Sequence, residues 1–86
     1  MQEPKIEFPC DYPIKVIGTS SPEFLSLIMT IVQKYDSSMA LDKTKERVSR
    51  EGNYTSITLL FWATGEGQLK DMFAELKECG DVHMVL

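Results

Sequence analysis

The carboxyl-terminal run Val82-His83-Met84-Val85-Leu86 is predicted to be a β-strand whose side chains alternate strictly between the two faces. Successive side chains of a β-strand point to opposite faces, so Val82, Met84 and Leu86 are predicted to share one face and His83 and Val85 the other. We expect this strand to tie the terminus of a complete, compact domain into a sheet. The run therefore predicts an architecture rather than an activity.

The first helix is predicted to begin at Ser21-Pro22-Glu23. Serine is a good capping residue, proline suits the first helical position, and glutamate favours the positive end of the helix dipole. Apolar residues then recur with a helical period over residues 24–35, and Asp36-Ser37-Ser38 ends the pattern. This helix should therefore bury one apolar face against the rest of the domain.

A second helix is predicted after the turn Thr64-Gly65-Glu66-Gly67. Its apolar stripe repeats at helical spacing from Leu69 to Leu76, and Gly80 is the expected carboxyl-terminal stop. Three further strands are predicted at 12–17, 44–51 and 54–63, with Gly52-Asn53 as a two-residue hairpin turn.

The predicted order is strand, helix, strand, strand, helix, strand. Each helix has one apolar stripe, so both should cover the same face of one sheet. Right-handed crossovers then favour an α+β fold, the ferredoxin-like βαββαβ two-layer sandwich with antiparallel strand order 4-1-3-2. This order places the polar strand 44–51 at an edge. Residues 1–86 form one domain, with 1–11 as an irregular lead-in.

Composition limits the function classes. A chain of 86 residues buries roughly 60–65% of its unfolded surface, which leaves little material for a deep active-site cavity. No run approaches the roughly 18 apolar residues of a membrane span, and the amino terminus lacks the pattern of a secretory signal. We therefore expect a cytoplasmic protein with no membrane partner. The net charge of -4 argues against nucleic acid as a partner.

The two cysteines, Cys10 and Cys79, lack metal-ligand spacing and are expected to be free thiols. The predicted fold places them at opposite ends of the sheet, roughly 15–20 Å apart, whereas a disulfide needs Cα atoms within about 7 Å. His83 is the sole histidine, which leaves little material for a catalytic triad or a histidine-rich metal site. We expect no cofactor, no metal and no enzymatic activity.

The face that the helices leave bare is the predicted interaction surface. If Glu51 pairs with Tyr54 across the hairpin, Lys45 lies opposite Leu60 and Lys43 opposite Trp62. The predicted interaction face comprises Lys15, Ile17, Lys43, Lys45, Arg47, Leu60, Trp62, His83 and Val85. Such a mixed basic and apolar surface is typical of a partner interface, although lysine stems could simply cover the apolar side chains.

A second candidate site is Gly18-Thr19-Ser20-Ser21, where a helix amino terminus could bind an anionic effector through backbone N–H groups. The alternative is plain capping by Ser21. An RNA-recognition module has the same element order, but only Tyr54 and Trp62 could stack bases. A small enzyme using Cys79 or His83 is a further alternative.

Four segments resemble the YbeD-like family of small bacterial proteins of unknown function. They are Phe8-Pro9-Cys10-Asp11-Tyr12-Pro13-Ile14-Lys15-Val16-Ile17-Gly18, Gly52-Asn53-Tyr54-Thr55-Ser56-Ile57-Thr58, Ala63-Thr64 and Met84-Val85-Leu86. The resemblance implies a fold like that of ACT regulatory domains, which bind small effectors in dimers, and a link of some relatives to lipoate metabolism. It supplies no established catalytic residues. His83, Gly65 and Gly67 depart from the family pattern.

We therefore expect a non-enzymatic regulatory or protein-interaction domain that uses the bare face of the sheet. Its partner would be another protein or a second copy of the chain. The alternative is a sensor of a small anionic effector.

Overall fold

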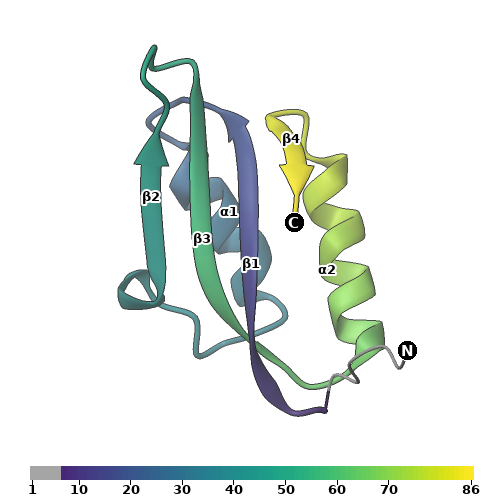
Figure 1. Cartoon of the computed structure of the whole chain (residues 1–86). Coiled ribbons are helices and arrows are strands. Elements are labelled where there is room, and N and C mark those ends of the chain that lie inside the picture. Colours follow the sequence, from purple (N-terminus) through teal and green to yellow (C-terminus); the bar gives the residue numbers. More distant parts are fainter. Residues whose placement is uncertain (1–6) are drawn as a thin grey trace, which may run out of the picture.

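The computed structural model describes residues 7–86, which form one four-stranded sheet with two helices packed against it (Figure 1). The elements in chain order are β1 (Cys10–Thr19), α1 (Phe24–Gln33), the short 3₁₀ helix η1 (Leu41–Lys43), β2 (Thr44–Val48), β3 (Tyr54–Ala63), α2 (Glu66–Glu78) and β4 (Val82–Val85). The predicted lead-in is shorter than expected, because β1 begins at Cys10. Residues 1–6 of that lead-in lie outside the described residues.

The strands are ordered β2-β3-β1-β4 across the sheet, which is the predicted order written from the other edge. All three neighbouring pairs are antiparallel. The two long central strands pair over their whole length, from Cys10 opposite Ala63 to Thr19 opposite Tyr54. The predicted βαββαβ sandwich is therefore confirmed.

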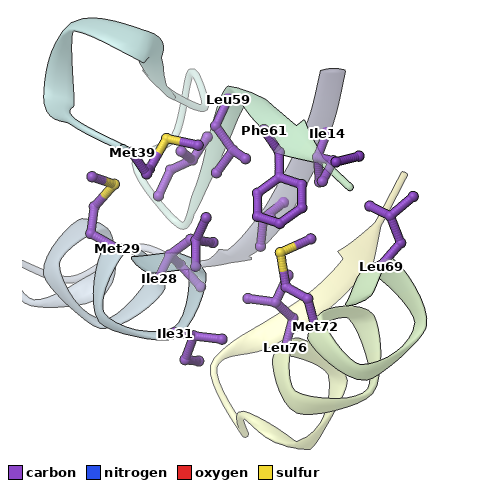
Figure 2. Packing of buried hydrophobic residues seen from close by; sticks show 14 of the residues in the cluster. Ile14, Ile28, Met29, Ile31, Met39, Leu59, Phe61, Leu69, Met72 and Leu76 are labelled. Carbon is purple, nitrogen blue, oxygen red and sulfur yellow. The ribbon is translucent and has the colours of Figure 1, made fainter. Parts of the chain in front are cut away.

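The core lies on one face of the sheet, between the strands and both helices (Figure 2). The fully buried side chains come from four elements and are Ile14, Val16, Phe24, Ile28, Val32, Ile57, Leu59, Phe61, Met72 and Leu76. They fall at every second position of the strands and at helical spacing in α1 and α2, as the two apolar periods require. Burying each such side chain contributes about 1.5–3 kcal/mol of transfer free energy.

Helix α1 begins later than the sequence predicts. Phe24 is its first residue and Glu23 occupies the N-cap position, with no side-chain capping hydrogen bond. The Ser21 carbonyl accepts the Phe24 N–H at 3.2 Å, so Ser21 contributes backbone rather than its hydroxyl, and Pro22 lies in the preceding turn. The predicted serine cap is therefore wrong.

The β2–β3 hairpin has a longer loop than the predicted two-residue turn. The Ser49 N–H donates to the Tyr54 carbonyl at 2.8 Å, and the Gly52 N–H donates to the Ser49 carbonyl at 2.9 Å. Gly52 has a φ of 77°, a left-handed conformation that glycine adopts without a steric penalty. Lys45 consequently lies opposite Thr58, two residues from the predicted register. A shift of two keeps every side chain on its predicted face.

A bulge between β1 and β4 overturns the predicted orientation of the last strand. Val85 pairs with Val16 and Met84 with Ile17, but Val82 pairs with Gly18, so His83 is an extra residue in the ladder. Val82 and Val85 pack against the core. The expectation that Val85 belongs to the bare face is therefore wrong.

Gly18 explains why the two strands can approach so closely at the bulge. The Thr19 N–H donates to the Asp81 carbonyl at 2.8 Å. A Cβ atom at Gly18 would lie 2.3 Å from that carbonyl oxygen and 2.5 Å from the ring of Phe24. Any side chain at this position would push β4 or α1 away.

Both cysteines are free thiols, as predicted. Cys10 lies opposite Ala63 at one end of β1, whereas Cys79 precedes Val82, which pairs at the other end of β1. Within residues 7–86, neither helix has the length and apolar character needed to cross a bilayer.

Candidate interaction surface

The face of the sheet opposite the helices carries the side chains between the buried positions of each strand. The pairings align them in rows across the strands. One row contains Arg47, Ser56, Ile17 and Met84, and the next contains Lys45, Thr58, Lys15 and Leu86. We call this surface the open face.

Apolar side chains gather at two places on the open face. Leu60 and Trp62 of β3 are 41% and 40% exposed, and Leu60 lies opposite Pro13 of β1. The second group lies at β4, where Met84 and Leu86 are 50% and 64% exposed beside Ile17 of β1. Met84 and Leu86 thus occupy the open face where the sequence predicted Val85. Exposed groups of this kind are typical of binding surfaces.

Three basic side chains lie on the open face, Lys15 between the two apolar groups and Lys45 and Arg47 along the edge strand β2. Lys15 and Lys45 flank Thr58 in the same row, Arg47 lies in the neighbouring row, and all three are exposed. Asp11, opposite Trp62, is an exposed carboxylate near one end of the same face. The open face is therefore positive at Lys15 and along its β2 side, although the whole chain has a net charge of -4.

Lys43 takes a different position from the one predicted. It belongs to η1, before β2 begins, and its Nζ donates to the Ser38 hydroxyl at 3.3 Å. It still borders a hollow of the open face with Pro13, Lys45 and Leu60. The shifted hairpin register is the reason that it does not lie opposite Trp62.

His83 lies at the opposite end of the open face from Trp62. Its Nε2 is 2.8 Å from the Thr19 hydroxyl oxygen, and its ring meets the ring of Tyr54 edge to face, with centroids 5.5 Å apart. Thr19 and Tyr54 are themselves opposite one another in the sheet. The bulge thus turns the imidazole across β1 towards β3.

The predicted anion site has few free donors. The N–H of Thr19 donates to Asp81 and that of Ser20 donates to the Asn53 carbonyl at 3.0 Å. The Ser20 hydroxyl is 2.6 Å from the Thr55 hydroxyl oxygen, and the Thr19 hydroxyl is shared with His83. The backbone N–H groups and hydroxyls of Thr19 and Ser20 are thus already hydrogen bonded within the protein.

Two side chains that position Trp62 were not singled out by the sequence. Asp36, only 6% exposed, accepts the Trp62 backbone N–H at 2.9 Å and both the N–H and the hydroxyl of Ser38. Gln68 accepts the Thr64 N–H at 2.7 Å and donates to the Tyr35 carbonyl at 2.7 Å and to the Trp62 carbonyl at 3.4 Å. Both backbone polar groups of Trp62 are thus hydrogen bonded to side chains.

The charge state of Asp36 follows from these contacts. Burial by itself would raise the pKa of the Asp36 carboxyl. Hydrogen bonds from the Ser38 side chain, the Trp62 N–H and the Ser38 N–H, together with the charge of Lys43, outweigh burial and hold that pKa below its ordinary value. Asp36 is therefore an ionised acceptor at neutral pH. The only sequence signal for it was the break in the helical pattern.

No group of three or more histidine, cysteine, aspartate or glutamate side chains among residues 7–86 is arranged to hold a metal ion. The open face instead offers flat apolar and cationic groups. Such an arrangement suits contact with another macromolecule.

The whole chain is similar to bacterial proteins of unknown function. A family model described as "Protein of unknown function (DUF493)" matches residues 3–86. A "UPF0250 protein" of Pseudomonas syringae is 48% identical over 83 residues, covering 95% of this chain and 90% of that protein. Another of Ectopseudomonas mendocina is 42% identical over 87 residues, covering 100% and 95%.

Solved structures share the fold at low sequence identity. A protein of H. pylori superposes with a TM-score of 0.74 at 18% identity, covering 99% of this chain and 89% of that one. The ACT domain from the GTP pyrophosphokinase of Chlorobium tepidum superposes with a TM-score of 0.63 at 16% identity, covering 90% and 97%. These likenesses confirm an ACT-like architecture. The family model over residues 3–86 and the relatives at 42–48% identity show that the chain belongs to the YbeD-like family of proteins of unknown function, DUF493.

Proposed function

We propose that this protein is a non-enzymatic regulatory domain that binds another protein through the open face of its sheet. The observation that carries this proposal is the exposure of Leu60, Trp62, Met84 and Leu86 on the one face of the sheet that no helix covers. A soluble domain gains nothing in its own stability from leaving such side chains in water. A partner that covered them would remove apolar surface from solvent.

The charges of the open face indicate the character of the partner. Lys15 lies between the two apolar groups, and Lys45 and Arg47 line the β2 side of the face. A partner surface with carboxylates opposite these cations and apolar side chains opposite the two apolar groups would be complementary. A second copy of this open face would bring the same cations together, which disfavours face-to-face self-association. The proposed partner is therefore a different, acidic protein.

Site-specific photocrosslinking in bacterial cells tests this proposal. A photoreactive phenylalanine analogue placed at Trp62 should crosslink to a discrete partner, because that side chain lies in the open face. The matched control carries the same analogue at Leu27, an exposed apolar position on α1. We expect the Leu27 probe not to capture that partner.

Charge reversal supplies the second arm of the experiment. The double change Lys45→Glu and Arg47→Glu should remove the crosslink from position 62 while the far-ultraviolet circular dichroism is unchanged. Identical products from positions 62 and 27, or a crosslink that survives charge reversal, would refute binding through the open face.

A further inference from the structure

Within residues 7–86, the outer edge of β2 pairs with no other strand. β2 ends the sheet order, and no described segment runs along its outer side (Figure 1). The Ser49 N–H bond to the Tyr54 carbonyl marks one hydrogen-bonded pair of the β2–β3 ladder. Hydrogen-bonded and non-hydrogen-bonded pairs alternate along an antiparallel ladder. Arg47 and Lys45, two and four residues before Ser49, therefore also form backbone hydrogen bonds with β3. The backbone groups of Glu46 and Val48 therefore point outward.

The side chains along this edge are uncovered on both faces of the sheet. Lys45 and Arg47 are exposed on the open face, and Glu46 and Val48 are exposed on the other face. Val48 is 53% exposed although its partner Thr55 is buried. The edge thus has free backbone donors and acceptors together with a defined charge pattern.

That charge pattern opposes pairing of β2 with the β2 of a second copy. An antiparallel pair that keeps the open faces on one side and centres on Glu46 would place Glu46 opposite Glu46 and Lys45 opposite Arg47. Shifting the pair by two residues would instead place Lys45 opposite Lys45, or Arg47 opposite Arg47. Like charges directly opposite one another destabilise a strand pair. Self-pairing is therefore disfavoured in each of these registers.

We propose that the β2 edge binds an extended acidic segment of another protein by adding it as a fifth, antiparallel strand. Two carboxylates at alternate positions of that segment would lie opposite Arg47 and Lys45. The residue before the first carboxylate would be apolar and cover Val48, and the residue between the carboxylates would be uncharged or basic, opposite Glu46. Main-chain hydrogen bonds to Glu46 and Val48 would hold the segment, and the side chains would select it.

This inference rests on the proposed protein-binding role and names the class of partner. The open face and the β2 edge share Lys45 and Arg47, so a segment paired at the edge would continue the same cationic surface. The two proposals nevertheless fail separately. Edge pairing depends on the backbone of Glu46 and Val48, whereas binding at the open face depends on Trp62 and its neighbours.

A synthetic peptide, acetyl-Thr-Val-Glu-Thr-Glu-Val-Thr-amide, is the probe. Titrated into isotope-labelled protein, it should slow hydrogen exchange at the amides of Glu46 and Val48, because both become hydrogen bonded. Amides of α2 serve as internal reference. A peptide with lysine in place of both glutamates should bind at least about tenfold more weakly, because two attractive cross-strand pairs become repulsive.

Two controls separate strand addition from simple charge attraction. The glutamate peptide N-methylated at its first valine and central threonine keeps its charge but cannot form the backbone pairs with Val48 and Glu46, so it should not protect either amide. The double change Lys45→Glu and Arg47→Glu should reverse the preference between the glutamate and lysine peptides. Binding without amide protection, equal binding of the N-methylated peptide, or no binding would overturn the inference and leave the Trp62 crosslinking result unaffected.

Discussion

At the scale of single residues, Asp36 connects the end of α1 to the strand that carries the candidate surface. Its carboxylate accepts hydrogen bonds from Ser38 next to it and from the Trp62 backbone 26 positions along the chain. A buried carboxylate is tolerated here because each of its two oxygens has a donor. The position of Trp62 on the open face therefore depends on an ionised side chain that accepts its backbone N–H.

The change Asp36→Asn should lower the free energy of unfolding by about 1–3 kcal/mol at neutral pH, because the amide nitrogen meets a backbone donor. The lowered pKa of Asp36 means that its ionised form adds stability above the ordinary carboxyl pKa of 3.8, and that this stability is lost as pH falls through the lower folded value. The difference between wild type and variant should therefore shrink below about pH 4.

Urea unfolding at several pH values measures this difference. Asp42→Asn is the matched control, since Asp42 is exposed in η1 and makes no side-chain hydrogen bond within residues 7–86. A constant gap between wild type and Asp36→Asn from neutral to strongly acidic pH would contradict the assignment of Asp36 as an ionised acceptor.

At the scale of elements, polar side chains connect the end of α1 to α2. Lys34, just after α1, makes an ion pair with Glu75 of α2, and the Tyr35 hydroxyl donates to the same carboxylate at 3.0 Å. The hydrogen bond from Lys34, followed by that from Tyr35, lowers the pKa of Glu75. These contacts fix the pairing of α1 and α2, whereas the core beneath them supplies most of the burial.

The bulge at His83 predicts a sharp difference between neighbouring residues of β4. Val85→Asp places a charge against the core and should cost about 2 kcal/mol or more, whereas Met84→Asp on the open face should change stability by no more than about 0.5 kcal/mol. Thermal and urea unfolding of the two variants provide the comparison. The opposite ranking would mean that β4 has the strictly alternating orientation.

At the scale of the whole molecule, the sheet holds the two thiols apart. Gly18 lies eight residues along β1 from Cys10, a span of about 26 Å, and Cys79 leads into the strand that pairs beside Gly18. A disulfide needs Cα atoms within about 7 Å. The native topology therefore prevents the two cysteines from meeting.

Mild oxidation of the folded protein should consequently leave both thiols available for alkylation within the monomer. In concentrated urea the same oxidant should form an internal Cys10–Cys79 bridge, because the unfolded chain brings its cysteines together. Intact-mass measurement after alkylation distinguishes the two forms. Rapid formation of the internal bridge in native buffer would be inconsistent with the strand order.

The elements themselves were predictable because they depend on local periods. β3 has the predicted bounds, Tyr54–Ala63, and the buried stripe of α2 runs from Leu69 to Leu76 as expected. The open-face positions of Lys15, Lys45, Leu60 and Trp62 also follow from a period of two, which survives a register shift of two residues. The predicted start of α1 was wrong, because Ser21 and Pro22 belong to a turn that precedes the helix.

The amino-acid sequence alone determined the number and order of the strands and α-helices and the face on which most side chains lie, because these follow from apolar periods of two and 3.6 residues. Only the tertiary structure decided the hairpin register, the turning of β4 at His83 and the role of Asp36. The turning of β4 and the role of Asp36 depend on contacts between distant segments, such as Thr19 with the Asp81 carbonyl and Asp36 with the Trp62 N–H, which no local pattern encodes. The hairpin register depends on the backbone hydrogen bonds that close the loop between Ser49 and Tyr54, which the residue types at Gly52-Asn53 do not specify.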